Sequence, residues 1–168
     1  MSMRKNFQCK TKQQYFRGSI SSGVRDWLFH AGSFMQRLQE HGIKDARIEV
    51  LNQDWQFPEE NERVLLNMRP RVYALIREVL IASGKDEWMF ARTVFPPAAL
   101  TGKLRQLRNL QTRSLGSVLF KDPALQRSEF EIYFDANKQQ WTRRSLFFLQ
   151  EKSLLLTEVF LPAMERFF

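Results

Sequence analysis

Hydrophobic positions follow a helical spacing near the start of the chain and an alternating spacing over much of the rest. Residues 22–41 carry apolar side chains at helical intervals, with a break predicted at Gly32-Ser33 and a stop at Gly42. Alternating or β-branched segments predict strands at residues 47–55, 73–82, 87–95, 129–136, 141–150 and 153–162. Residues 56–70 predict a loop with a short helical turn, and further helix is predicted at 98–110 and 115–120.

The predicted strands fall into hairpins, while the helices lie early and in the middle of the chain. This order favours an α+β fold with a single antiparallel sheet covered by helices. The 168 residues suit one domain with a substantial core, since 43% of them are hydrophobic, including 15 phenylalanines. We therefore expect a single domain spanning residues 1–168.

One predicted hairpin carries two arginines on a face that is otherwise apolar. A turn at Ser83-Gly84-Lys85-Asp86 places Arg77 opposite Arg92. The same face would carry Leu75, Val79, Ile81, Trp88, Phe90 and Val94. Like charges facing each other on a sheet are destabilising, and burying an unpaired charge is costlier still. Two such guanidinium groups imply an anionic partner, either protein carboxylates or a ligand that carries carboxylates or phosphates.

A purely structural explanation of these arginines stands beside the ligand. A slip of one residue in the turn would send one arginine to the other face of the sheet. Glu78 or Glu87 could also pair with an arginine from a neighbouring strand. The residues alone leave both explanations open.

Glu158 lies on an apolar face of the last predicted strand, which it shares with Leu154, Leu156 and Phe160. A tight turn at Glu151-Lys152 would place it opposite Ser145, with Arg143 beside Ser145 on the same face. A carboxylate on such a face needs a partner. It is either half of a buried ion pair with Arg143 or a carboxyl group of raised pKa that acts as an acid or a base.

Composition argues against several classes of site. A single cysteine, Cys9, excludes a disulfide framework and a zinc cluster, and the only histidines are His30 and His41. The sequence has no glycine-rich phosphate loop and no apolar run of membrane-spanning length. We therefore expect neither a metal nor a cofactor.

The net charge of +8 raises the question of nucleic acid or an anionic membrane surface. The most basic segment, 103–113, has leucines at 104, 107 and 110 and predicts an amphipathic helix with a solvated cationic face. Aromatic residues alternate inward on strands instead of interleaving with basic ones, so no nucleic-acid partner is expected. Residues 1–25 carry six Lys or Arg and no acid, without the apolar core of a secretory signal, which favours a cytoplasmic protein with a basic N-terminal stretch.

Several short motifs occur along the chain in the same order as in one known family. They are Asp26-Trp27-Leu28 with Ser33, Arg77-Glu78, Arg92-Thr93-Val94 with Pro96, Leu100-Thr101-Gly102, Leu115-Gly116 with Leu119-Phe120, Asp135-Ala136, Arg143-Arg144-Ser145 and the run 154–162. In this order and at this spacing, the chain resembles the chorismate–pyruvate lyase family from about residue 26 to residue 162. The segment before Asp26 and the loop 52–69 match the family poorly.

The resemblance implies an enzyme that converts chorismate to 4-hydroxybenzoate and pyruvate by cofactor-free elimination, at the start of bacterial ubiquinone synthesis. It also implies an antiparallel sheet covered by helices, with the ligand enclosed under flaps. We expect a cytoplasmic monomer without stable membrane insertion. The alternative is a non-catalytic binder of aromatic carboxylic acids on the same fold, and the presence of Glu158 favours the enzyme.

The resemblance further assigns roles to individual residues. Arg77 would grip the ring carboxylate, together with the backbone N–H groups of Phe34 and Leu115. Glu158 would meet the 4-hydroxyl end, and Arg92 would lie near the enolpyruvyl side and stabilise the departing negative charge. With a pKa raised by burial, Glu158 would protonate the leaving oxygen, the role that we favour; if ionised, it would take the ring proton. Phe34 replaces the methionine of a relative, a change that a backbone contact would survive but that could alter the pocket and product release.

Overall fold

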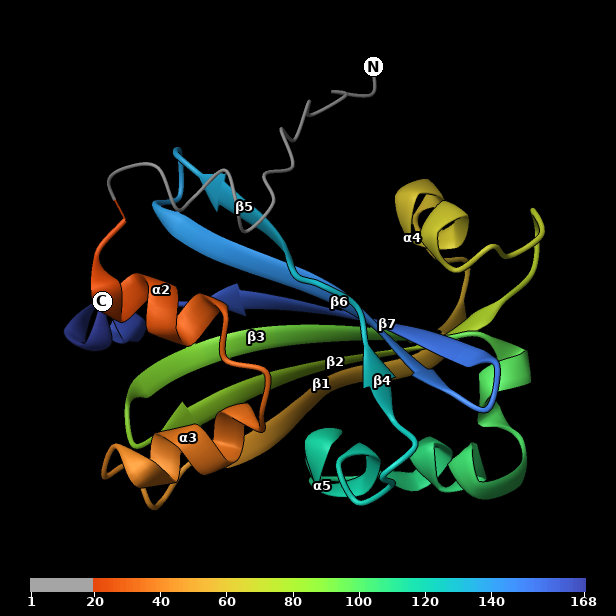
Figure 1. Cartoon of the computed structure of the whole chain (residues 1–168), viewed down its shortest axis with the longest axis horizontal. Coiled ribbons are helices and arrows are strands. Elements are labelled where there is room, and N and C mark those ends of the chain that lie inside the picture. The colour runs from red at the N-terminus through yellow and green to blue at the C-terminus, as the bar shows by residue number, and fades with distance from the viewer. Residues whose placement is uncertain (1–19) are drawn as a thin grey trace.

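The computed structural model describes residues 20–168, and these form one twisted antiparallel sheet with helices packed around it (Figure 1). Within this part of the chain the sheet has seven strands in the order β1-β2-β3-β7-β6-β4, with β5 paired to β6. The predicted α+β fold with a single antiparallel sheet is therefore confirmed. Most of the basic N-terminal stretch, residues 1–19, lies outside the described residues.

The elements agree closely with the expected ones. The α-helices are α2 (Ser22–Leu28), α3 (Phe34–Glu40), α4 (Glu60–Leu65) and α5 (Gly116–Leu119), and the 3₁₀ helices are η1 (Pro97–Leu100), η2 (Gly102–Asn109) and η3 (Pro162–Phe167). The strands are β1 (Arg47–Gln56), β2 (Ala74–Ser83), β3 (Asp86–Phe95), β4 (Gln126–Arg127), β5 (Glu131–Asp135), β6 (Gln140–Leu149) and β7 (Lys152–Phe160). The short strand β4 and the helix η3 were not predicted.

Helix ends are set where the sequence places capping residues. Ser21 and Ser33 accept hydrogen bonds from the N–H groups of Val24 and Gln36, which caps α2 and α3. The predicted break in the first helical segment is confirmed. Just beyond α3, Gly42 adopts a φ of +88°, a left-handed conformation that glycine accepts at little cost.

Residues 98–110 form 3₁₀ turns instead of the expected α-helix. Pro96 precedes η1 and Pro97 is its first residue. Thr101, in an extended conformation, separates η1 from η2, which begins at Gly102 with a φ of +58°. The amphipathic pattern nevertheless holds. Leu104, Leu107 and Leu110 are buried, whereas the basic residues Lys103, Arg105 and Arg108 are exposed. The cationic face of this segment is solvated, as predicted.

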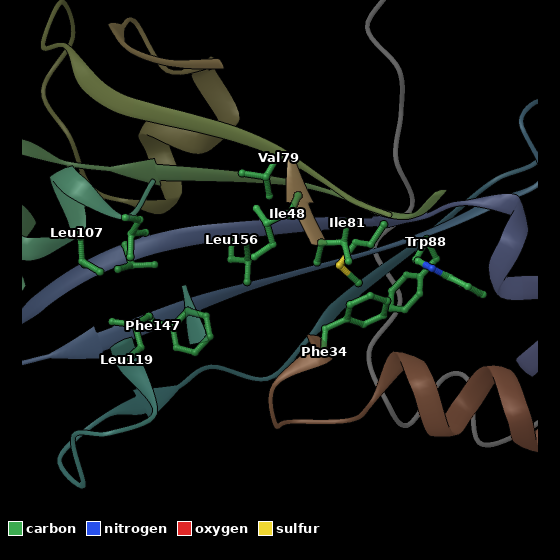
Figure 2. Packing of buried hydrophobic residues seen from close by; sticks show 14 of the residues in the cluster. Phe34, Ile48, Val79, Ile81, Trp88, Leu107, Leu119, Phe147 and Leu156 are labelled. Atoms are coloured by element: carbon green, nitrogen blue, oxygen red, sulfur yellow. The ribbon is translucent and has the colours of Figure 1, made fainter. Parts of the chain in front are cut away.

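The two faces of the sheet bury clusters of very different size. The larger core lies under α2, α3, η2 and α5 (Figures 1 and 2). In Figure 2, Phe34 of α3 lies near Ile81 and Trp88, while Leu119 of α5 lies beside Phe147. The smaller cluster, on the other face, consists of Leu66, Met68, Ala74, Ile76, Val94 and Leu155, and the partly buried Leu65, Val72 and Leu146 pack against it. A side chain's face therefore decides which of two environments it enters.

The predicted pairing of the β2–β3 hairpin is wrong by one residue. Ala82 pairs with Glu87 across the two-residue turn, but Ile81 pairs with Met89, which leaves Trp88 as the extra residue of a β-bulge. The indole of Trp88 is fully buried and donates to Ser83 Oγ at 2.9 Å. Beyond the bulge Arg77 pairs with Thr93, and Arg92 pairs with Glu78. The two arginines therefore lie on opposite faces of the sheet.

The β6–β7 hairpin turns one residue earlier than expected. Gln150 and Glu151, with φ of +52° and +63°, form the turn, and Leu149 pairs with Lys152. The register consequently shifts by two residues, which keeps every side chain on its predicted face. Glu158 lies directly opposite Arg143 and not opposite Ser145.

Candidate functional site

A cavity opens between the large-core face of the sheet and the segments that cover it. The sheet contributes Arg77 and Glu158, along with apolar residues of β2, β3 and β7. The cover consists of residues 32–35, at the α2–α3 junction, and residues 113–116, which lead into α5. Apolar walls with a few convergent charged groups are typical of a small-molecule site.

Arg77 is a buried cation at the β2 side of this cavity. Its side chain is 3% exposed and donates to Gln53 Oε1 at 2.9 Å and to the carbonyl oxygens of Gln111 and Arg113 at 2.6 and 3.3 Å. None of the ion pairs within residues 20–168 involves Arg77. Burial lowers the pKa of Arg77, although a guanidinium remains cationic at neutral pH. This charge has neutral acceptors but no counter-anion in the described part of the protein.

Arg92 has the opposite character. Its Nε and Nη2 donate to the two carboxylate oxygens of Glu62 at 2.7 and 3.0 Å, and Nη1 donates to Glu78 at 2.7 Å. These hydrogen bonds and charges raise the pKa of Arg92, despite its partial burial. Pairing with Glu78, one of the structural explanations, is what the structure shows, and the bulge at Trp88, with the turn in its expected place, puts the two arginines on opposite faces. The expected position of Arg92 beside Arg77 is wrong, and its expected catalytic role loses its geometric basis.

Replacing Arg92 with alanine should therefore reduce stability and leave the cavity intact. Glu62 is 5% exposed as a side chain, so removing Arg92 strands a buried carboxylate at a cost of about 3 kcal/mol. At roughly 2–4 °C per kcal/mol for a chain of this size, the melting temperature should fall by about 10 °C. Thermal unfolding and turnover, both measured on this variant, test the assignment; a lost turnover in protein that is still folded would restore a catalytic Arg92.

Glu158 forms a buried ion pair with Arg143, which is one of the two explanations that the sequence left open for this residue. Arg143 Nε and Nη2 donate to the carboxylate at 2.6 and 3.0 Å. Arg143 Nη1 donates to the carbonyl oxygens of Trp27, Leu28 and His30, at the C-terminal end of α2. These contacts fix the carboxylate against the sheet, yet Glu158 still lines the cavity.

The pKa of Glu158 is lowered, contrary to the sequence-based expectation. Burial alone would raise this pKa, but the guanidinium groups of Arg143 and Arg127 outweigh burial through charge and hydrogen bonding. Glu158 is therefore an anion at neutral pH. An ionised carboxylate accepts hydrogen bonds or protons, and it has no proton to give to a leaving group.

Arg127 is the site residue that the sequence did not reveal. It lies on β4, which is only two residues long and pairs with β6 through Phe147 and Phe148. Its guanidinium donates to Glu158 Oε2 at 3.2 Å, to Ser145 Oγ at 2.9 Å and to the carbonyl oxygen of Ala31 at 3.0 Å. A strand this short has no hydrophobic periodicity, so no sequence pattern marked the residue.

Phe34 and Leu115 both line the cavity from its covering segments. Phe34 is the first residue of α3, so its backbone N–H has no partner within the helix. Leu115 immediately precedes α5. The structure thus brings Arg77, Phe34, Leu115 and Glu158 to one cavity and leaves Arg92 out of it.

Two kinds of feature are absent from residues 20–168. No three His, Cys, Asp or Glu side chains of this part are grouped so that they could hold a metal ion. Likewise, none of its helices combines the length and apolar character needed to cross a bilayer.

Comparison with known proteins gives this geometry a context. The sequence matches the family profile described as chorismate lyase over residues 10–167. It is 35% identical over 161 residues to a probable chorismate pyruvate-lyase of Marinobacter nauticus, covering 88% of this chain and 86% of the relative. It is also 35% identical over 154 residues to the chorismate pyruvate-lyase of Proteus mirabilis, covering 88% and 85%.

Solved structures with much lower identity share the fold. The C-terminal domain of PhnF matches with a TM-score of 0.56 and 14% identity, over 70% of this chain and 83% of that domain. The effector domain of PhnF from Mycobacterium smegmatis matches with a TM-score of 0.56 and 10% identity, over 78% and 89%. These likenesses bear on the fold alone, whereas the profile match and the sequence relatives cover most of the chain. The chain belongs to the chorismate lyase family.

Proposed function

We propose that the protein converts chorismate to 4-hydroxybenzoate and pyruvate, the first step of ubiquinone biosynthesis. The observation that carries the proposal is the buried Arg77, which has no ion-pair partner within residues 20–168, in an apolar cavity that also contains the ionised Glu158. Family membership supplies the substrate class. We further propose a cytoplasmic monomer that needs no cofactor.

Arg77 would bind the ring carboxylate, which substrate and product share. A charge-assisted, forked contact satisfies a buried guanidinium far better than the neutral acceptors that it has in the described residues. The backbone N–H groups of Phe34 and Leu115, which line the cavity from its covering segments, would complete the carboxylate site.

Glu158 would accept a hydrogen bond from the hydroxyl at ring carbon four. In the sheet register Val79, Ala91 and Glu158 lie in one row, and Arg77 lies two residues along β2 from that row. Two strand spacings and a two-residue offset separate the Cα atoms of Arg77 and Glu158 by roughly 12 Å. One six-membered ring between the two head groups suits this separation, with its carboxylate toward Arg77 and its hydroxyl toward Glu158.

The proposed elimination balances without a redox partner. The bond from ring carbon three to the ether oxygen breaks with its electron pair on oxygen, and ring carbon four loses its proton as the ring becomes aromatic. The released enolpyruvate then takes up a proton at its methylene carbon and becomes pyruvate. As an anion, Glu158 can accept the hydroxyl hydrogen bond and can serve as the base for the ring proton.

The second candidate function, a non-catalytic binder of aromatic acids, needs only the Arg77 side of the cavity. The buried carboxylate and its two guanidinium partners are an expensive arrangement for a site that merely binds. This cost favours the enzyme over the binder.

Purified protein mixed with chorismate should release 4-hydroxybenzoate and pyruvate in equal amounts, with EDTA present and nothing else added. Absorbance of the aromatic product and a coupled pyruvate assay measure the two products separately. Loss of activity in EDTA that a divalent metal restores would contradict the cofactor-free elimination. Tight binding of 4-hydroxybenzoate without consumption of chorismate would show that the protein is a binder.

A further inference from the structure

Within residues 20–168 the cavity holds more positive charge than its carboxylate balances. Arg77 has no ion-pair partner there, and Glu158 is shared between Arg143 and Arg127. Chorismate carries two carboxylates. The proposed function assigns the ring carboxylate to Arg77 and leaves the enolpyruvyl carboxylate without a binding residue. The enolpyruvyl carboxylate needs a second cation, and Arg92 is on the wrong face of the sheet for this.

Of the two guanidinium groups on Glu158, that of Arg127 is the less well satisfied. Arg143 donates hydrogen bonds to both carboxylate oxygens of Glu158, at 2.6 and 3.0 Å, and to three carbonyl oxygens at the end of α2. Among the described residues, Arg127 reaches one of these carboxylate oxygens, at 3.2 Å, and otherwise only a hydroxyl and one carbonyl. Arg127 lines the cavity.

The surroundings of the Arg127 guanidinium are apolar, so they do little to compensate for its few hydrogen-bond acceptors. The guanidinium of Arg127 lies over the rings of Phe130 and Phe147, at 4.4 and 4.5 Å from their centroids, and the side chain is 11% exposed. Burial, together with the nearby charge of Arg143, lowers the pKa of Arg127 to about 10, against the opposing effect of Glu158. The group is still cationic at neutral pH, but an additional anion would stabilise it.

We propose that Arg127 binds the carboxylate of the enolpyruvyl side chain, which makes it a catalytic residue of the elimination. Ring carbons three and four are neighbours, so a ligand whose 4-hydroxyl meets Glu158 carries its enolpyruvyl group next to the guanidinium that touches Glu158 Oε2. When the bond to ring carbon three breaks, negative charge develops on the departing oxygen. A fixed cation in a dry cavity stabilises that charge where it forms. This inference rests on the proposed function, because it needs chorismate in the cavity.

Two ligands that differ by a single carboxylate isolate this contact. 4-Hydroxybenzoate carries the ring carboxylate alone, whereas 3-(carboxymethoxy)-4-hydroxybenzoate adds a second carboxylate through an ether oxygen at ring carbon three. Calorimetry would give the Kd of each ligand for wild type and for Arg127→Gln. We expect the variant to bind the dicarboxylate roughly 10- to 100-fold more weakly, the range for a lost hydrogen bond between charged groups. Its affinity for 4-hydroxybenzoate should change less than about threefold, and kcat/KM for chorismate should fall with the dicarboxylate affinity.

Arg144→Gln is the matched control. Arg144 lies on β6 next to Arg143 and donates to Glu131 and Tyr133, but it does not line the cavity. This control should keep both affinities. Arg127→Lys keeps the charge without the forked donor and should lose less dicarboxylate affinity than Arg127→Gln, which guards against a folding defect in the first variant.

The outcomes separate the two proposals. Equal losses for both ligands would show that Arg127 only positions Glu158, and an unchanged dicarboxylate affinity would show that it binds no second carboxylate; either result overturns this inference alone. Failure of the wild-type protein to bind either ligand would overturn the proposed function and this inference with it. A loss confined to the dicarboxylate establishes the second anion site.

Discussion

Replacing Arg77 with alanine should weaken binding of both chorismate and 4-hydroxybenzoate by about 2–4 kcal/mol, roughly 30- to 1000-fold in Kd. Both molecules carry the ring carboxylate, so the loss should be the same for substrate and product. The reason is that Arg77 is a buried cation with no ion-pair partner among the described residues. Calorimetry with 4-hydroxybenzoate and steady-state kinetics with chorismate measure the two losses.

The matched control for this variant is Arg92→Ala, on the paired strand but on the other face of the sheet. Its partners are the carboxylates of Glu62 and Glu78. It should keep its affinity for 4-hydroxybenzoate and lose thermal stability, whereas Arg77→Ala should lose affinity. If the two variants exchanged these behaviours, the assignment of the carboxylate site to Arg77 would be wrong.

The sequence predicts the sheet well because its strands are long and their side chains alternate. β2 and β3 were located to within a residue or two, and so was the turn between them. The relative position of Arg77 and Arg92 was nevertheless wrong, because Trp88 occupies a bulge. Side chains on a strand alternate with a period of two, so a single extra residue moves every later side chain to the other face.

Such a bulge is decided by packing between distant segments. The Trp88 ring is buried against Phe167 and Arg166 of η3, and its N–H reaches Ser83 across the hairpin. Phe167 and Arg166 lie outside residues 73–95, so neither of these contacts can be inferred from the pattern of that segment. Local alternation therefore places the arginines on strands, and tertiary packing decides which face each one occupies.

The raised pKa that the sequence predicts for Glu158 is wrong for a related reason. An apolar strand face predicts desolvation, which raises the pKa of a carboxyl group. The two cations that reverse this shift come from β6 and from the two-residue strand β4. The sequence predicts one of them, Arg143, on the same sheet face as Glu158. Its position directly opposite Glu158 depends on where the β6–β7 turn lies. Arg127 had no pattern to reveal it.

Replacing Glu158 with glutamine should lower turnover of chorismate by about 100-fold or more, the usual scale of a general acid–base contribution. Glutamine keeps the shape and can accept a hydrogen bond from the 4-hydroxyl, so affinity for 4-hydroxybenzoate should change less than about tenfold. The variant should also lose about 3 kcal/mol of stability, because Arg143 remains buried without its carboxylate. Turnover must therefore be compared at a temperature at which the variant is folded.

The stability loss has a defined pH dependence. The folded-state pKa of Glu158 is lowered, so its carboxylate stabilises the fold above the unfolded-state pKa of about 4.3. That contribution disappears as the pH falls through the lower folded-state value. The difference in unfolding free energy between wild type and Glu158→Gln should thus be largest near neutral pH and shrink below about pH 4. Denaturant unfolding across this range measures it, and a difference that grows toward acid pH would contradict an ionised Glu158.

A double variant separates catalysis from folding. Arg143→Met with Glu158→Gln removes both halves of the buried ion pair, a replacement that is often neutral for stability or even stabilising. It should recover much of the melting temperature lost by Glu158→Gln, while turnover stays low because the carboxylate is still absent from the cavity. Recovered turnover in the double variant would mean that the single variant had failed through instability. In that case Glu158 would be a structural residue, and the base for the ring proton would have to be sought elsewhere in the cavity.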